Sequence, residues 1–262
     1  QLLYNHANWS GNNSEKISLS DFAKSIIDRD HKRINISQIR SNLQYAKDSI
    51  ATTDYPQKIC LHYLPEGFSF SSKLCFTVGY DLGIVYQNNA SINLSHKHYL
   101  ENPSELKYYS IHELHHAGFV QLKKNYMPSL NIKTCGEMAK LIAYFSHLEG
   151  MAVYAAYDER LKDNALNNDP DYMALQDIAL MKKYTKRYFE IYNHFLAHSN
   201  DTLTEKDWSM LGELSSGDRL WYRVGAQMAA NIDKKSGRNK LTGLIAEPSE
   251  NFIRNYQQLN ED

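Results

Sequence analysis

The sequence predicts an α+β protein in which a small, mostly antiparallel sheet packs on helices and is followed by a larger helical half. Between residues 58 and 95, short β-branched and aromatic segments alternate with turn residues, as is typical of strands. After His98, apolar residues recur at helical spacing behind capping residues. The chain has 262 residues, 42% of them hydrophobic, which is enough to bury a sizeable core.

The N-terminal region comes first in this layout. Residues 1–17 are rich in Asn, Ser and Gly, and we expect a loop or a frayed terminus there. Two amphipathic helices should follow, at about Ser20–Arg29 and about Ser37–Ala51. Each opens on a Ser whose hydroxyl can cap the helix.

The sheet is predicted from short segments separated by turn chemistry. Asn88-Asn89 suits a tight hairpin turn, because Asn tolerates positive φ. We expect three or four strands, mostly in an antiparallel meander. The strand-like segments are Lys58–Leu64, Leu74–Tyr80, Gly83–Gln87 and Ala90–Ser95.

The helical half is predicted from capping residues and periodicity. Asn102 can cap a helix for which Pro103 suits the first position. Thr134 and Glu137 have the spacing of a capping box, and Gly237 can end a later helix. The predicted helices span about Pro103–Leu122, Thr134–Leu161, Asp169–His198, Thr204–Leu214, Asp218–Ser236 and Ser249–Leu259.

The composition excludes several classes of function. With 29 Lys and Arg against 30 Asp and Glu, the net charge of −1 argues against a nucleic-acid binder that works by bulk charge. No apolar run is long enough for a transmembrane helix. Cys60, Cys75 and Cys135 cannot form a disulfide framework or a Cys-based zinc site. The sequence contains no other signal for a cellular compartment, and a start at Gln1 rather than Met favours export.

One motif carries chemistry. His112-Glu113-Leu114-His115-His116 satisfies the pattern H-E-x-x-H inside a predicted helix. His112 and His116 are four residues apart, so both imidazoles lie on one helical face and can reach a single zinc ion. Glu113 is rotated by about 100° from His112, which lets its carboxylate approach a water without ligating the ion. Composition alone predicts roughly 0.02 chance matches, and the apolar neighbours of the motif indicate a buried helix.

Two histidines need a third ligand, and Glu149 is the preferred candidate. It follows His116 on the next predicted helix, within an apolar stripe where a lone carboxylate would be costly. A buried Glu149 satisfied by Lys, Arg or Tyr is the simpler alternative. Glu137 is a rival ligand, although its capping-box position already explains it. Asp158 and Glu159 are further rivals near the polar end of the helix.

These residues carry a resemblance to a known family. The motif, with Glu149-Gly150-Met151-Ala152-x-Tyr154 after it, resembles the gluzincins, zinc metallopeptidases that place H-E-x-x-H on one helix and a ligand Glu on the next. The resemblance covers roughly residues 58–246, and the first helices have no counterpart. It implies a zincin-like cleft between sheet and helical half, one Zn²⁺ ion and a peptide or protein substrate. The chain lacks the Gly-x-Met-Glu-Asn exopeptidase motif and has Val153 where thermolysin-like enzymes have Asp.

The resemblance also implies roles. Zn²⁺ held by His112, His116 and Glu149 would acidify a water whose proton Glu113 takes as general base and passes to the leaving amine. Tyr222 would donate to the oxyanion. Tyr222 packing as an ordinary core residue is the alternative, and so is Arg223 as the donor or as a binder of a substrate carboxylate. In gluzincins the strand at the position of Ala90–Ser95 forms the sheet edge and pairs with extended substrate, which would here be β-augmentation.

This interpretation divides the chain into three parts: residues 1–55 with the N-terminal loop and helices, 56–122 with the sheet and motif helix, and 123–262 with the helical half that carries the third ligand. Residues 56–262 would form one catalytic unit. The alternative function is a catalytically silent metal-binding or interaction protein with the same fold, and a third is an iron enzyme with the same two-His, one-carboxylate set. Nothing in the sequence indicates the cleavage specificity or the oligomeric state.

Overall fold

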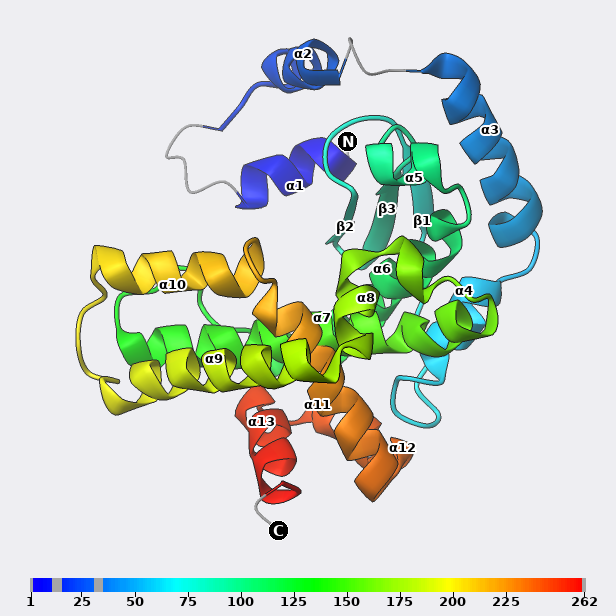
Figure 1. Ribbon diagram of the computed structural model, residues 1–262. Helices are drawn as coiled ribbons and strands as arrows, with labels where there is room; N and C mark the ends of the chain where they lie inside the picture. The colour runs from blue at the N-terminus through cyan, green and yellow to red at the C-terminus, as the bar shows by residue number, and fades with distance from the viewer. Residues whose placement is uncertain (1, 11–15, 31–34, 261–262) are drawn as a thin grey trace.

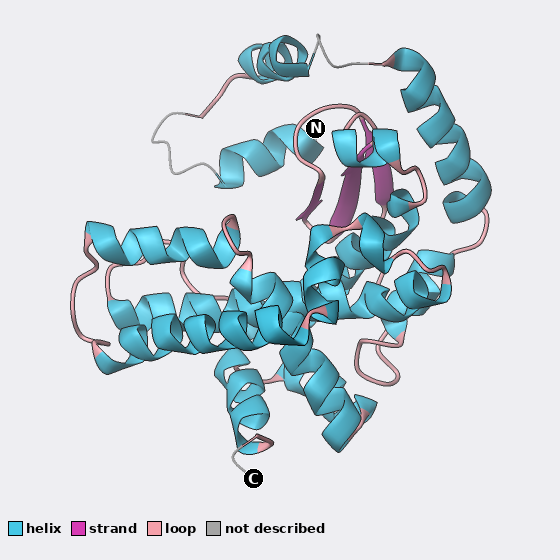
Figure 2. Cartoon of the chain, in the orientation of Figure 1, coloured by secondary structure: helices cyan, strands magenta, loops and turns pink. Residues whose placement is uncertain are grey.

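The fold is α+β, as predicted, with many helices around one small sheet (Figures 1 and 2). The computed structural model describes residues 2–10, 16–30 and 35–260. The predicted loop within residues 1–17 therefore lies partly outside the described residues. None of the helices in the described part combines the length and the apolar character that a membrane span requires.

The N-terminal region contains more helix than expected. Helix α1 (Leu2–Ser10) forms where we predicted a loop or frayed terminus, so that prediction is wrong for these residues. Contacts with the rest of the chain stabilise it: the His6 Nδ1 atom lies 3.0 Å from the Tyr80 hydroxyl, and α1 packs against strand β2. Tertiary contacts of this kind override weak local propensity.

The two predicted amphipathic helices are present, as α2 (Leu19–Asp30) and α3 (Ile36–Ala46), the second continuing as the π-helix η1 (Lys47–Ala51). Ser18 caps α2, because its hydroxyl accepts a hydrogen bond from the Asp21 amide at 3.1 Å. The cap of α3 is Asn35 rather than Ser37. Its side-chain oxygen accepts from the Gln38 amide, and the Ser37 hydroxyl donates to the same oxygen.

The predicted strand Lys58–Leu64 is wrong, because this segment belongs to helix α4 (Tyr55–Leu61). Pro56 lies in the first turn, where its missing N–H costs nothing. Pro56 and Cys60 are both buried and are four residues apart, which is helical spacing. Helix α4 packs on α6, the motif helix.

The sheet is mixed rather than an antiparallel meander. Its strands are β1 (Leu74–Thr77), β2 (Gly83–Tyr86) and β3 (Asn89–Asn93), in the order β1-β3-β2. Strands β2 and β3 form the predicted antiparallel hairpin, with Gln87 and Asn88 at φ values of 48° and 64°. Strand β1 pairs with β3 in parallel, because the chain crosses from one side of β3 to the other before β2 begins.

This order corrects the prediction that Ala90–Ser95 is the edge of the sheet. Strand β3 lies in the centre, with β1 on one side and β2 on the other, so its backbone groups are already paired. The edges are β1 and β2. In Figure 1, helix α1 lies on the β2 side of the sheet and α3 on the β1 side.

The longer helices of the helical half agree with the sequence, with differences at the motif helix and at Asp177, and several short helices were not predicted. The short helix α5 (Lys97–Glu101) precedes the motif helix. The motif helix α6 starts at Glu105 behind Ser104, so Asn102 is not its cap. The predicted helix 169–198 divides at Asp177, whose side chain caps the second piece. The elements are α6 (Glu105–Leu122), η2 (Lys124–Tyr126), α7 (Cys135–Lys162), η3 (Leu166–Asn168), α8 (Pro170–Gln176), α9 (Ile178–Ala197), α10 (Glu205–Ser215), α11 (Leu220–Ser236), α12 (Arg238–Gly243), η4 (Leu244–Ala246) and α13 (Ser249–Gln258).

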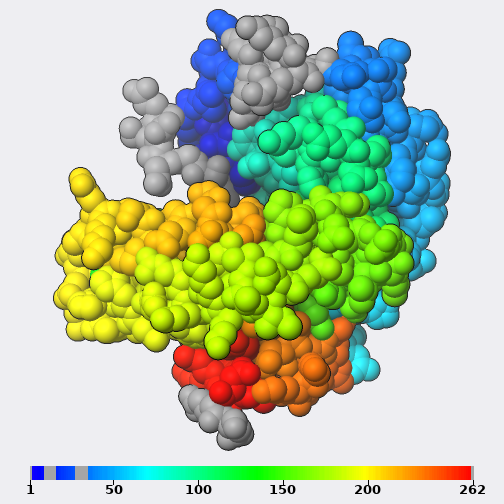
Figure 3. Space-filling view, viewed as in Figure 1, coloured from blue at the N-terminus to red at the C-terminus, as the bar shows by residue number. Residues whose placement is uncertain are grey.

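Helix α7 is the centre of the helical half and packs against α6, α9, α11 and α13. Its closest crossing is with α11. A Cβ atom on Gly150 would lie 2.3 Å from the carbonyl carbon of Gly225, and one on Gly225 would lie 2.2 Å from the Ser146 oxygen. Two facing glycines therefore let α11 approach α7 backbone to backbone. Helices α9 and α10 and the first part of α7 together form an arm (Figures 1 and 3).

Candidate metal centre

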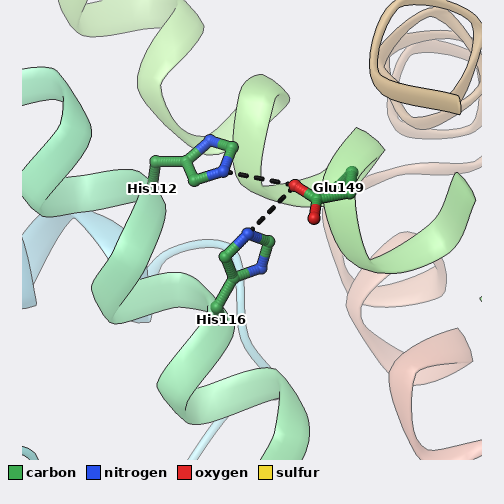
Figure 4. A group of neighbouring side chains, drawn as sticks. All are labelled: His112, His116 and Glu149. Atoms are coloured by element: carbon green, nitrogen blue, oxygen red, sulfur yellow. Dashed lines mark hydrogen bonds and ion pairs between the residues drawn. The ribbon is translucent and has the colours of Figure 1, made fainter. Parts of the chain in front are cut away.

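Helices α6 and α7 bring three candidate ligands together. The Nε2 atoms of His112 and His116 lie 3.4 Å and 3.1 Å from the same carboxylate oxygen, Oε2 of Glu149 (Figure 4). The two imidazole rings are nearly perpendicular, with centroids 4.5 Å apart. All three side chains are almost buried, with exposed fractions of 11%, 9% and 13%. The one-turn spacing on α6 thus converges on Glu149 from the neighbouring helix.

The donor set fits zinc. Two imidazole nitrogens and one carboxylate oxygen are typical ligands of a zinc site that keeps a fourth position open. Donors placed tetrahedrally at 2.0–2.2 Å from zinc are roughly 3.3–3.6 Å apart. The ligand atoms here all lie within 4.8 Å of one another. Only small shifts would therefore be needed for the three side chains to hold one ion.

Electrostatics couples the three groups. Burial lowers the pKa of His112, and the neighbouring His116 lowers it further. Burial also opposes protonation of His116, but the Glu149 carboxylate outweighs it and raises the pKa of His116. Burial would raise the pKa of Glu149, yet the two imidazoles hold it well below its usual range. Glu149 therefore stays an anion in a nearly dry site, which is the state in which it can ligate a cation.

Glu113 lies beside this cluster with its carboxylate against strand β2. It is 6% exposed, and burial raises its pKa to about 8. A Cβ atom on Gly83, the first residue of β2, would lie 2.4 Å from Glu113 Oε1. The carboxylate therefore occupies space that only glycine leaves free. Sequence reasoning missed Gly83, whose one signal was a glycine at the start of a strand.

The rival carboxylates are engaged elsewhere. Glu137 closes the capping box of α7, since its side chain accepts from the Thr134 amide. Asp158 accepts a hydrogen bond from the Tyr63 hydroxyl at 2.8 Å, and Glu159 is paired with Lys162. None of these carboxylates joins the histidine pair among the described residues.

Tyr222 and Arg223, the two candidate oxyanion donors, have different surroundings. Tyr222 lines the cleft in front of the cluster. Burial, followed by the nearby Glu149 carboxylate, raises its pKa well above the usual range, so its hydroxyl stays a neutral donor. Arg223 instead binds the Asp171 carboxylate at 2.9 Å and the Tyr184 hydroxyl at 3.1 Å. Arg219, one turn earlier, does line the cleft and was missed.

The remaining histidines of the region have structural partners. His115 Nε2 lies 3.1 Å from the Tyr63 carbonyl oxygen, and His147 stacks on Phe252. A second group of potential ligands, His98, Glu105 and Asp169, is also close enough for an ion. The buried Arg160 already binds it, with hydrogen bonds of 2.7 Å and 2.5 Å to the two oxygens of Glu105 and an ion pair of 3.7 Å to Asp169.

A cleft of about 1090 Å³ opens in front of the candidate metal centre. Helix α6 contributes Tyr109, His112, His116 and Val120 to the lining, in this order. These residues therefore mark successive positions along the cleft. The end near Tyr109 is polar and charged and includes Asp169, Asp171 and Arg219; the end near Val120 is apolar and includes Met127, Leu130 and Phe145.

Comparison with known proteins gave one match. The family model described as "Putative zinc dependent peptidase (DUF5700)" matches residues 1–262. This range includes the N-terminal helices, for which the motifs had no counterpart. No curated protein and no solved structure matches the chain.

Proposed function

The chain belongs to this family, which is described as "Putative zinc dependent peptidase", and we propose that it hydrolyses peptide bonds with one zinc ion held by His112, His116 and Glu149, in the manner of a gluzincin. The observation that carries the proposal is the convergence of these three side chains, with Glu113 beside them. Each is nearly buried, and no Lys or Arg neutralises Glu149 among the described residues. The simpler alternative of a structurally paired Glu149 therefore has less support.

A zinc ion bound there supplies Lewis acidity and makes a water easier to deprotonate. The protein side chains do the rest. Glu113 accepts the proton of the attacking water and delivers it to the leaving amine. Its buried position against Gly83 keeps the carboxylate beside the ligands without making it one of them. Tyr222 donates its hydroxyl proton in a hydrogen bond to the oxyanion.

The substrate would bind along β2, the edge strand nearest the candidate centre. Strand β2 lines the cleft from Gly83 to Tyr86. The Asn93 amide donates to the Leu82 carbonyl at 3.0 Å, so residues 82, 84 and 86 face β3 by strand alternation. The backbone groups of Gly83 and Val85 then face away from β3. An extended peptide could pair with them and lie across the metal ligands.

The test is metal analysis of the purified protein together with cleavage of a peptide library. We expect about one zinc per chain and cleavage that Glu113→Gln reduces by roughly 10²–10⁴-fold, with zinc content unchanged. Glu190→Gln, on the exposed face of α9, is the matched control and should cleave at the wild-type rate. Stoichiometric zinc without cleavage of any library would support the catalytically silent alternative, and bound iron would support the third.

A further inference from the structure

Arg219 is a charged side chain in the cleft to which the proposed hydrolysis assigns no role. It precedes α11 with φ 50° and ψ 45°, a left-handed conformation that is uncommon for arginine. Its guanidinium lies 3.7 Å from the centroid of the Tyr222 ring. It therefore sits beside the proposed oxyanion donor, at the polar end of the cleft.

Asp171 fixes the orientation of this guanidinium. Nε of Arg219 donates to both Asp171 oxygens at 3.1 Å and 3.0 Å, and Nη2 lies 2.9 Å from Oδ2. Asp171 is itself buried and is held by Arg223 at 2.9 Å. Nη1 of Arg219 donates to no group in the part of the chain that the structure describes, and the side chain is 36% exposed. The edge of the guanidinium formed by Nε and Nη2 is thus bound to Asp171, and the edge that includes Nη1 is open.

The charge of this group suits an anion. Arg219 and Arg223 share the single Asp171 carboxylate, so Asp171 compensates only part of their charge. The nearby carboxylates of Glu105 and Asp169 have Arg160 and His98 as partners. An open guanidinium edge binds a carboxylate through two parallel hydrogen bonds.

The position of Arg219 along the cleft follows from Asp169. The Tyr109 hydroxyl donates to Asp169 at 2.8 Å, and the Asp171 amide donates to the other oxygen of Asp169 at 2.8 Å. Arg219, which Asp171 binds, is therefore at the Tyr109 end of the cleft. Tyr109 precedes the ligand His112 by about one helical turn.

We propose that Arg219 binds a carboxylate of the substrate in the cleft. The carboxylate is either the C-terminus of the peptide, which makes the enzyme a carboxypeptidase, or an acidic side chain. This inference rests on the proposed function for a peptide as the ligand. It rests on Arg219 and Asp171 for the carboxylate.

Binding measured without turnover tests the inference. Zinc-loaded Glu113→Gln protein is titrated calorimetrically with three peptides: acetyl-Phe-Leu-Ala as the free acid, the same peptide as the C-terminal amide, and acetyl-Phe-Leu-Glu amide. We expect the free acid to bind roughly 10- to 100-fold more tightly than the Ala amide. Tight binding of the Glu amide would assign the site to an acidic side chain instead of the terminus.

Variants identify the group responsible. Arg219→Gln, made in the same background, should bring the three affinities together, and Arg219→Lys should retain part of the preference because it keeps the charge near Asp171. Arg187→Gln, which removes an exposed guanidinium paired with Glu213, is the matched control and should change nothing. Circular dichroism verifies that each variant is folded.

The outcomes separate the two proposals. If the Glu113→Gln protein that retains Arg219 binds the three peptides with equal affinity, or binds none of them measurably, the inference is overturned. An acid preference that survives Arg219→Gln assigns the carboxylate to the metal ion and also overturns it. Carboxylate preference that depends on Arg219, together with no hydrolysis by the wild-type protein, leaves this inference standing and contradicts the proposed function.

Discussion

At the scale of single residues, the position of Glu113 depends on Gly83, which has no side chain. A Cβ atom on Gly83 would lie 2.4 Å from Glu113 Oε1, so strand β2 and helix α6 approach closely at this point. A general base must reach its proton at hydrogen-bond distance, and a misplacement of about 1 Å can cost roughly 10²-fold in rate. Gly83 is therefore part of the positioning of Glu113.

We predict that Gly83→Ala lowers peptide turnover by at least tenfold, roughly, because the methyl group displaces the Glu113 carboxylate. Zinc content should not change, since Gly83 is not one of the three ligands and the atoms nearest to the added Cβ all belong to Glu113. The measurement is turnover and metal analysis on the same preparation. Gly212→Ala, on α10 with no atom near the added Cβ, is the control. Equal turnover of the two variants would show that Gly83 does not position the base.

A second residue-scale prediction concerns the buried Lys123, which contacts His147 and the carbonyl oxygens of Leu244 and Glu247. Burial lowers its pKa to about 8, against the opposing charges of Glu250 and Glu247. The unfolded chain binds this proton more tightly, so Lys123 destabilises the fold below pH 8. The penalty is relieved as the pH rises from about 8 toward the unfolded value near 10.5.

Lys123→Met removes this titration. The free energy of unfolding of the wild type should therefore rise relative to that of the variant between pH 7 and pH 10. Urea unfolding at both values measures the difference, and titrations common to both proteins cancel. A difference that is independent of pH would mean that Lys123 has an ordinary pKa in the folded protein.

At the scale of elements, the crossing of α7 and α11 connects the metal ligand to the cleft residues. Glu149 is on α7, and Tyr222 is on α11. Gly150 and Gly225 let the two backbones meet between them. The glycine after Glu149, which the sequence showed only as part of a resemblance, thus has a physical role in packing.

We predict that Gly150→Ala destabilises the protein by about 1–3 kcal/mol, because the added methyl group overpacks this crossing. The free energy of unfolding from urea titration measures the effect. Gly243→Ala has open space at the added Cβ and should stay within about 0.5 kcal/mol of the wild type. A Gly150→Ala protein as stable as the control would contradict the close approach of α7 and α11.

The edge strand β2 gives the second element-scale prediction. Val85→Pro removes an N–H that faces away from β3, so the β2–β3 ladder should survive. If substrate pairs with this edge, peptide cleavage should fall by roughly tenfold or more while zinc content and the unfolding transition stay unchanged. Full cleavage by a folded Val85→Pro protein would exclude β2 as the pairing edge.

At the scale of the whole molecule, patterns with a strong period were predictable and pairings in space were not. The approximate extents of α6, α7 and α11 followed from apolar periodicity, and capping residues placed the start of α7 and the end of α11. The order of the strands did not, because β1 and β2 have similar patterns and only the tertiary structure places β3 between them. Helix α4 was mistaken for a strand because its few apolar residues, in a segment of seven residues, fit either period.

The candidate site shows the same division. His112, Glu113 and His116 could be found from spacing on one helix, and Glu149 from a carboxylate in an apolar stripe. Gly83 and Arg219 could not, because their roles depend on which segments the fold brings beside α6. Arg223 was considered at the sequence level, yet a turn of α11 directs it to Asp171 and Tyr184.

The central claim is that one zinc ion lies between α6 and α7. Anomalous diffraction from crystals of the zinc-loaded protein, recorded on both sides of the zinc absorption edge, tests it directly. The account predicts one strong peak within bonding distance of the Nε2 atoms of His112 and His116 and a Glu149 carboxylate oxygen. A peak only at His98, Glu105 and Asp169, or no zinc peak beside His112 and His116, would contradict it.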